Sequence, residues 1–188
     1  MNKKYLSNAP RLVESFRVIV FILLFLNCYA ETGYSQWLQW GGPNRNFKVD
    51  SAQLKTAWTE GEPEQLWKRQ LGEGHSAICV DQGTLYTMFR RGDEDVVTAL
   101  NADTGTTLWE YAYTSLLWKE FSKQYGPGPH ATPLIVGDYI YAIGFRTELT
   151  CLDKKNGQKV WSHNLWDEYN AKPGDRGYAS SPMAYKDL

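Results

Sequence analysis

The segment Ala99-Leu-Asn-Ala-Asp-Thr-Gly-Thr-Thr-Leu-Trp109 is the most informative part of this sequence, because a second copy follows as Cys151-Leu-Asp-Lys-Lys-Asn-Gly-Gln-Lys-Val-Trp161. The copies lie 52 residues apart and share a leucine, an Asn or Asp, a glycine and a tryptophan. An Asn or Asp followed by glycine is typical of a tight turn, because glycine adopts a positive φ at little cost. The shared positions are Leu100, Asn101, Gly105 and Trp109 in the first copy and Leu152, Asp153, Gly157 and Trp161 in the second. Two copies of one unit indicate a repeat protein.

Each copy divides into four short strand-like segments separated by turn residues. We expect strands at roughly 76–80, 84–89, 95–101 and 106–111 in the first copy, and at roughly 131–136, 139–144, 148–153 and 158–162 in the second. Four antiparallel strands in each repeat predict an all-β fold, a β-propeller of four-stranded blades. Upstream of residue 90 the two copies lie 55 residues apart, whereas downstream of residue 95 they lie 52 apart, so the first copy has three extra residues. We assign them to a longer turn at 90–95.

Trp67, in the segment 64–69, has the sequence of a fourth strand that no first three strands precede. An N-terminal strand can complete the last blade of a propeller and so remove an open sheet edge, and we expect this role for 64–69. The large indoles of the repeat are expected to pack between neighbouring blades. A third copy opens at 177–183. Since propellers have about four to eight blades, the sequence predicts a truncated N-terminal part of one.

The N-terminus has the order of a secretory signal. Basic residues precede an unbroken apolar run at 18–26, and small residues follow it. The run is shorter than the roughly 20 residues of a transmembrane helix. We therefore expect a signal peptide at 1–30; an uncleaved anchor or lipidation at Cys28 are the alternatives, and Asn27 fits lipidation poorly. The expected organisation is a signal peptide (1–30), an N-terminal segment (31–63) and a partial propeller (64–188) with closing strand 64–69, blade 75–111, insertion 112–130, blade 131–162 and the start of a further blade at 178–188.

Composition and charge exclude some classes of function. The formal net charge is −1, so there is no basic surplus to neutralise phosphates, and a nucleic-acid partner is not expected. Cys79 and Cys151 lie in apolar segments and are expected to be small buried hydrophobes, with a bridge between them left open in an oxidising compartment. The acidic cluster at 93–95 is expected to form a solvated turn tip. Its spacing fits no calcium loop, and no metal site is predicted.

Two histidines occupy equivalent places where the blades begin. His75 and His130 lie 55 residues apart, and a residue repeated at each blade entrance is usually structural. The alternative is that both line the central channel and share a ligand or metal. The insertion between the copies is expected to pack over the propeller rim, with a short helix from Ser115 to Gly126; a lid or partner-binding segment is the other interpretation.

The motif at 99–109 resembles the tryptophan-docking motif of the pyrroloquinoline-quinone (PQQ)-like propeller family. The segment at 37–46 also resembles the start of exported bacterial members, and 126–133 and 177–182 resemble their blade openings. The resemblance covers 37–188. Departures are mild: Asn101, Cys151 and Asn156 replace the Asp, Ala and Thr of the motif.

This resemblance leaves two functions open. The first is a non-catalytic exported module or scaffold that binds a protein, glycan or small ligand, as the outer-membrane-assembly relatives do. The second is a quinoprotein dehydrogenase of alcohols or sugars that uses PQQ and calcium. Many such enzymes have adjacent cysteines and need a calcium-binding carboxylate cluster, and the sequence shows neither. We favour the first, with no catalytic residues and no cofactor, in the periplasm, at the outer membrane or secreted. Membrane association is expected only through an uncleaved or lipidated N-terminus.

Overall fold

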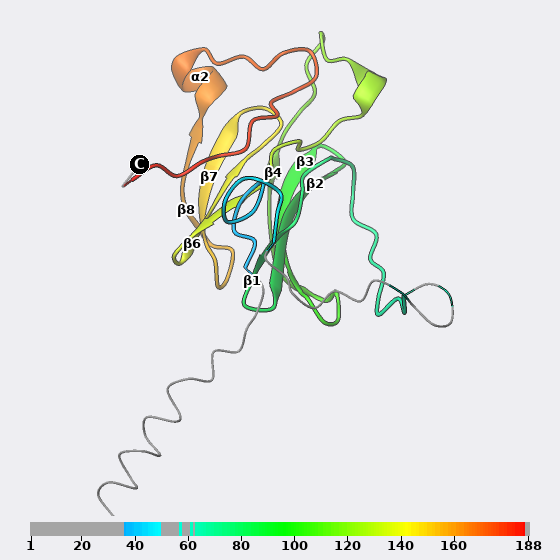
Figure 1. Ribbon diagram of the computed structural model, residues 1–188. Helices are drawn as coiled ribbons and strands as arrows, with labels where there is room; N and C mark the ends of the chain where they lie inside the picture. The colour runs from blue at the N-terminus through cyan, green and yellow to red at the C-terminus, as the bar shows by residue number, and fades with distance from the viewer. Residues whose placement is uncertain (1–35, 50–56, 58–60, 62, 187–188) are drawn as a thin grey trace, which may run out of the picture. The chain divides into compact units, whose positions relative to one another are not determined.

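The computed structural model describes residues 36–49, 57, 61 and 63–186, all within one compact unit, Tyr34–Leu188. Two four-stranded antiparallel sheets follow one another along the chain, each with its strands in sequence order (Figure 1). The first sheet contains β1 (Cys79–Asp81), β2 (Thr84–Arg91), β3 (Glu94–Asn101) and β4 (Thr107–Thr114). The second contains β5 (Leu134–Val136), β6 (Tyr139–Ile143), β7 (Glu148–Asp153) and β8 (Lys159–Asn164). The predicted signal peptide at 1–30 lies outside the described residues.

The core lies between the two sheets, because each contributes one apolar face. The buried cluster contains Cys79, Tyr86, Met88, Val97 and Ala99 from the first sheet and Ile135, Ile140, Ala142 and Leu152 from the second. Such burial of apolar surface is the main favourable term in folding. The sheets are therefore packed as neighbouring blades, and the predicted all-β blade architecture is confirmed.

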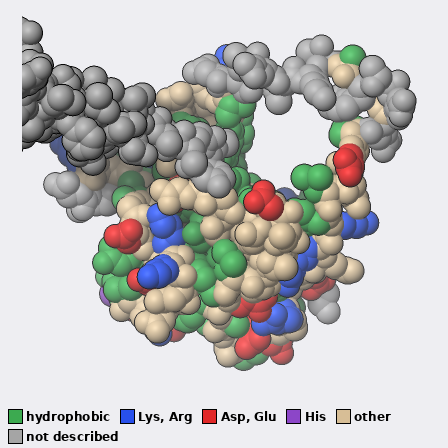
Figure 2. All heavy atoms as spheres, turned by 90° about the horizontal axis from the view of Figure 1, so that it is seen from below, with side chains coloured by type: hydrophobic (Ala, Val, Ile, Leu, Met, Phe, Trp, Pro, Cys, Tyr) green, Lys and Arg blue, Asp and Glu red, His purple; other side chains and the backbone are tan. Residues whose placement is uncertain are grey.

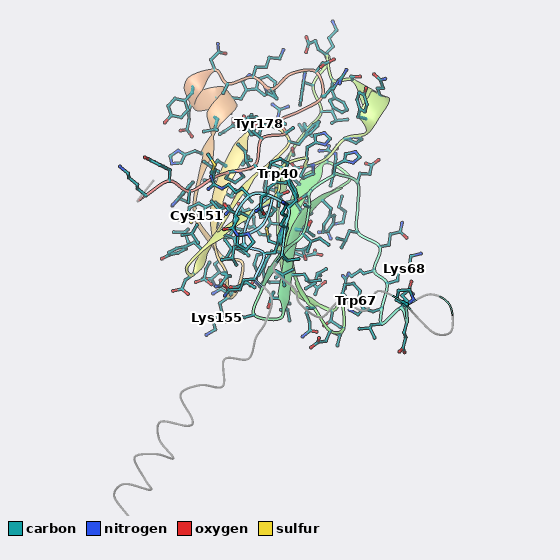
Figure 3. All side chains as sticks on the ribbon, viewed as in Figure 1. Trp40, Trp67, Lys68, Cys151, Lys155 and Tyr178 are labelled. Atoms are coloured by element: carbon teal, nitrogen blue, oxygen red, sulfur yellow. The ribbon has the colours of Figure 1, made fainter. Side chains whose placement is uncertain are left out.

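The repeated tryptophans fasten each unit to the next turn along the chain. Trp67 donates its indole N–H to the carbonyl of Ala102 at 2.9 Å, and Trp109 donates to the carbonyl of Lys154 at 3.0 Å (Figure 3 labels Trp67). Each indole also lies on a glycine. A Cβ on Gly105 or Gly157 would come within 2.5 Å of the indole of Trp67 or Trp109, respectively. Trp67 and Trp109 therefore pack on the turn of the following blade, whereas the third tryptophan of the motif, Trp161, is 36% exposed.

The turns beneath these indoles have the same hydrogen bonds in both blades. The side-chain oxygen Oδ1 of Asn101 accepts the backbone N–H groups of the residues two and three further on, at 3.0 and 2.9 Å. Oδ1 of Asp153 does the same at 2.9 and 3.1 Å. Gly105 and Gly157 take positive φ values of 67° and 71°. Asn at the first position therefore replaces the Asp of the motif without changing the turn.

The two blades differ in the hairpin between their second and third strands. Arg90 pairs with Asp95 in the β2–β3 ladder, and the chain reverses at Gly92 and Asp93. The expected longer turn at 90–95 is therefore wrong, because the additional residues lengthen the strands. β2 and β3 have eight residues each, whereas β6 and β7 have five and six.

Two segments that were expected to be strands are not paired in the part of the chain that the structure describes. Residues 64–69 and 178–186 have no assigned strand, because a strand needs a neighbour with which to form a ladder. Instead, the N-terminal segment lies along the first strands. Trp37 forms an antiparallel bridge with Val80, and the carbonyl of Leu38 accepts the N–H of Ile135 at 2.8 Å.

Helical structure is confined to short pieces in the described ranges. The insertion contains only the 3-10 turn η1 (Lys123–Tyr125), so the expected helix from Ser115 to Gly126 is wrong. The physical reason is that the hydroxyl of Ser115 bonds to Asp95 instead of capping a helix. The helix α2 (Leu165–Tyr169) follows β8. Neither piece approaches the length and apolar character needed to cross a bilayer, nor does any other described helix.

Candidate functional site

The blade entrances lie side by side and are joined by hydrogen bonds. The N–H of Ala77 donates to the hydroxyl of Thr132 at 3.2 Å, and the N–H of Thr132 donates to the hydroxyl of Ser181 at 2.9 Å. These three residues are equivalent in the three copies of the repeat. The opening at 177–183 therefore packs on the second blade in the way that the second blade packs on the first.

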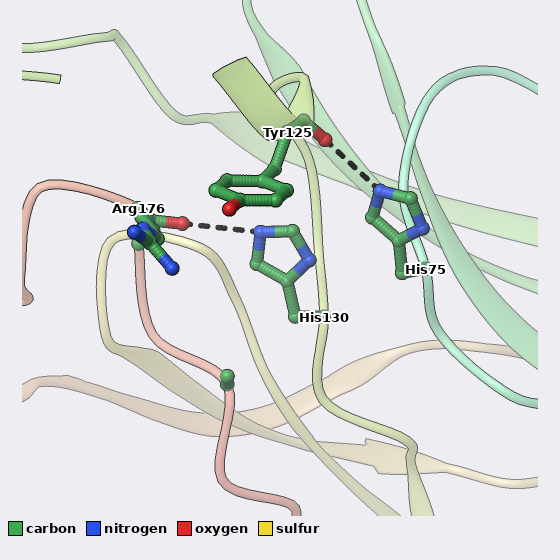
Figure 4. A pocket seen from close by; sticks show the side chains of 6 residues that line it. His75, Tyr125, His130 and Arg176 are labelled. Carbon is green, nitrogen blue, oxygen red and sulfur yellow. Dashed lines mark hydrogen bonds between the residues drawn. The ribbon is translucent and has the colours of Figure 1, made fainter. Parts of the chain in front are cut away.

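His75 and His130 come together at these entrances. Their rings are stacked, with centroids 5.2 Å apart and planes inclined by 12° (Figure 4). The Nε2 atom of His75 lies 3.0 Å from the carbonyl oxygen of Tyr125, and that of His130 lies 3.1 Å from the carbonyl oxygen of Arg176. Because a carbonyl oxygen only accepts, each Nε2 carries the hydrogen and each ring has a fixed orientation. Their participation in ligand binding stays a prediction.

Two non-repeated segments supply these carbonyl groups and are fastened to each other. The N–H of Ser122, in the insertion, donates to the carbonyl of Asp175 at 2.6 Å. The rings of Trp118 and Trp166 meet edge to face at 5.6 Å, and Lys172 forms an ion pair with Glu120 at 3.5 Å. Trp118 also lies 5.2 Å from the buried ring of Phe145. The insertion therefore packs on the blades, as one of the two interpretations proposed.

The two blade entrances and the two non-repeated segments border an open pocket of about 320 Å³. It is lined by His75, Tyr125, His130, Arg176, Gly177 and Ala179. The guanidinium carbon of Arg176 lies 4.4 Å from the centroid of the Tyr125 ring. Burial lowers the pKa of His130, and the proximity of His75 lowers it further, while the hydrogen bond to the Arg176 carbonyl opposes both. Arg176 gives the pocket a permanent positive charge, because a guanidinium stays protonated at neutral pH.

Sequence reasoning found the two histidines but missed Tyr125 and Arg176 as site residues. The histidines recur with the repeat, whereas Tyr125 and Arg176 lie in segments with no counterpart in the other copy. The remaining signal is that each lies just before a blade opening, three residues or fewer from Gly128 or Gly177. Ala179 occupies the position that His130 has in the preceding copy, so the third copy has no histidine at this position.

A second polar cluster lies at the junction of the blades and is wholly buried. Asp95 is 0% exposed, and its Oδ2 atom accepts the N–H of Phe145 at 2.9 Å and the hydroxyl of Ser115 at 3.0 Å. Its Oδ1 atom lies 3.7 Å from the guanidinium of Arg90. Burial raises the pKa of Asp95 to about 6, although these partners lower it. The expectation of a solvated acidic tip is therefore wrong for Asp95, because the long hairpin carries it over the second blade.

The cysteines are buried and not bridged. Both thiols are free, so the structure does not contain the Cys79–Cys151 disulfide that the sequence left open. The thiol of Cys79 donates to the carbonyl of Pro133 at 3.0 Å, and burial raises its pKa to about 12. A thiol with so high a pKa is inert as a nucleophile.

Two packed four-stranded sheets whose tryptophans dock on the next turn define a β-propeller of the PQQ-like repeat class. A family described as outer membrane protein assembly factor BamB matches residues 44–178, and the chain belongs to this family. No curated protein matches the chain.

Solved structures give matches of low similarity. Quinohemoprotein alcohol dehydrogenase from Comamonas testosteroni is 19% identical, with a TM-score of 0.44 over 61% of this chain and 16% of that one. A europium-containing methanol dehydrogenase is 20% identical, with a TM-score of 0.35 over 46% of this chain and 14% of that one. BamB from Moraxella catarrhalis is 16% identical, with a TM-score of 0.29 over 50% of this chain and 37% of that one. The chain thus spans well under half the length of each.

Proposed function

We propose that this chain acts as a non-catalytic binding module of an exported propeller, at work in the periplasm, at the outer membrane or outside the cell. The binding surface is the pocket at the blade entrances, and its ligand is a small molecule or a group on a protein or glycan. One observation carries the proposal: both imidazoles in the pocket are held by backbone carbonyls on one side and by each other's ring face. Because both rings have a fixed orientation, they can contact a ligand without first being ordered by it.

The chemistry of the lining supports binding over catalysis. General acid-base catalysis at neutral pH needs a side chain whose pKa is tuned near 7, and nucleophilic catalysis needs an activated hydroxyl, thiol or amine. The lining residues include no Ser, Cys, Lys, Asp or Glu. The pKa of His130 is lowered, which favours its neutral form.

The residues described here do not fit PQQ with calcium. Calcium takes about six to eight oxygen ligands, mainly carboxylates and carbonyls. No carboxylate lines the pocket, and the described ranges hold no group of three side chains suited to a metal. The two stacked imidazoles also leave no gap between them for a flat ring. No step through PQQ is therefore assigned to these residues.

A nucleic-acid partner finds no support in the surface charge. Figure 2 shows Lys and Arg side chains interspersed with Asp and Glu on the face that it presents. A nucleic-acid binder instead concentrates positive charge on one surface. The mixed surface fits a protein, glycan or small-molecule ligand.

The test has a binding arm and a catalytic arm, both on the full-length chain. Small acids, sugars and amines are screened by NMR, with Tyr125→Ala as the variant that removes a pocket wall; we expect at least one saturable ligand that the variant loses. In parallel, the chain is incubated with PQQ and calcium, and dye reduction is followed with alcohols and aldoses. Turnover that stops on addition of a chelator would contradict the proposal and establish the dehydrogenase.

A further inference from the structure

The pocket at the blade entrances contains a cation, the guanidinium of Arg176. The guanidinium of Arg176 lies over the Tyr125 ring at 4.4 Å, and in the part of the chain that the structure describes its N–H groups enter no ion pair or hydrogen bond. A guanidinium that stacks through its face keeps the N–H groups at its edge available. These form a planar fork that matches the two oxygens of a carboxylate.

The rest of the lining is mostly apolar and contains no acid. The ring of Tyr125, the methyl group of Ala179 and the backbone of Gly177 form walls without charge, and two imidazole rings complete the lining. No Asp or Glu lines the pocket to neutralise Arg176. A cation beside apolar walls favours a ligand with one negative charge and a carbon body.

We propose that this pocket binds a small organic acid with one carboxylate and an apolar body. The carboxylate binds the guanidinium of Arg176, and the body packs against the Tyr125 ring and Ala179. This inference rests on the proposed function, because it names the class of ligand for the same site.

The size and shape of the pocket set limits on the ligand. A volume of about 320 Å³ is at the lower end of the roughly 300–1,000 Å³ of small-molecule sites. His75 and His130 are stacked on each other with their planes inclined by 12°, so a ring cannot enter between them. A single ring or a short aliphatic chain beside the stack meets both limits.

The probe for this test is benzoate, titrated into the full-length chain while the imidazole resonances of His75 and His130 are followed by NMR. Benzyl alcohol has the same ring without the charge, and inorganic phosphate has charge without the ring. Arg176→Gln removes the fork, whereas Lys155→Gln removes a positive charge from the exposed turn at 153–158, outside the pocket. Arg176→Lys keeps the charge but loses the fork. Thermal melts show whether each variant folds.

We expect saturable benzoate binding that Arg176→Gln weakens about tenfold or more, that Arg176→Lys weakens less, and that Lys155→Gln leaves within about twofold. Benzyl alcohol or phosphate binding as tightly as benzoate would overturn the inference, as would unchanged affinity in a folded Arg176→Gln or Arg176→Lys variant. In those cases another ligand from the screen still supports a binding module. If no ligand binds at all, the proposed function fails as well.

Discussion

The two blades share one plan at one end of their strands and differ at the other. At the end that contains the turns at 101–106 and 153–158, each blade presents the same Asx turn, the same positive-φ glycine and the same carbonyl acceptor to the preceding tryptophan. At the opposite end the first blade has a longer β2–β3 hairpin, which reaches the turn after β6 and places Asp95 on the N–H of Phe145. The joint between the two blades is therefore held at both ends: at one by the repeated contact between tryptophan and turn, and at the other by Asp95, which has no counterpart in the second blade.

The repeated contact between a tryptophan and the next turn gives the largest expected effect on stability. Trp109 is docked on the second blade, whereas the equivalent Trp161 is 36% exposed and docks on no turn among the described residues. We expect Trp109→Ala to lower the free energy of unfolding by about 3 kcal/mol, the lower end of the usual cost of deleting a large aromatic residue, because Trp109 is partly buried. Trp161→Ala should cost about 1 kcal/mol or less, as for exposed positions. Chemical denaturation of both variants measures the difference. Equal losses of stability would show that docking on the next turn does not make Trp109 more important than Trp161.

The buried carboxylate of Asp95 makes the free energy of unfolding depend on pH. Because burial raises the pKa of Asp95 from 3.8 to about 6, the folded state binds this proton more tightly than the unfolded state does. The resulting stabilisation is complete below pH 3.8 and is lost as the pH rises through about 6. Two units of pKa correspond to a change on the order of 3 kcal/mol.

Asp95→Asn removes this titration while keeping a side chain of the same size. We expect the stability of the native chain, relative to this variant, to fall between pH 4.5 and pH 7. Melting temperatures of both proteins across that range give the difference. Asp93→Asn changes an exposed carboxylate in the turn of the same hairpin and serves as the control. A flat difference curve for Asp95→Asn would mean that the buried carboxylate does not titrate in this range.

The close contact beneath Trp109 gives a smaller effect that can be separated from backbone strain. Gly157 and Gly137 both take positive φ, at 71° and 57°, but only a Cβ on Gly157 would collide with an indole. Both alanine variants share the cost of the left-handed backbone. We expect Gly157→Ala to cost about 1–3 kcal/mol more than Gly137→Ala, the usual range for overpacking. Denaturation curves of the pair test this, and equal losses would indicate that the indole simply moves aside.

The smallest expected effect concerns the first residue of the repeated turn. Asn101 and Asp153 accept the same pair of backbone N–H groups through Oδ1. Asn101→Asp should therefore change the free energy of unfolding by less than about 0.5 kcal/mol, as for a surface substitution that keeps its contacts. Asn101→Ala removes the acceptor and should cost roughly 1 kcal/mol. Similar melts for Asn101→Ala and the native chain would mean that the glycine alone maintains the turn.

Sequence reasoning was successful where a local pattern is repeated. The strands, the two Asx turns and the docking of Trp67 and Trp109 depend on short-range periodicity and on turn chemistry, both of which are visible without coordinates. It was wrong at the hairpin, where three additional residues fit a longer turn and longer strands equally well. It was also wrong about a helix in the insertion, because the partner of Ser115 is 20 residues away in sequence.

The blade unit follows from the sequence alone, since its strands alternate and its turns need particular residues at fixed spacing. Which side chains meet depends on the packing of segments that are distant in sequence. The burial of Asp95 depends on how far one hairpin extends over the neighbouring blade. Likewise, Tyr125 and Arg176 reach the histidine pair because two non-repeated segments pack on each other through Trp118 and Trp166. Local patterns carry the free-energy preferences of the backbone, whereas contacts between distant segments depend on the packing of the whole unit, which no single stretch of sequence encodes.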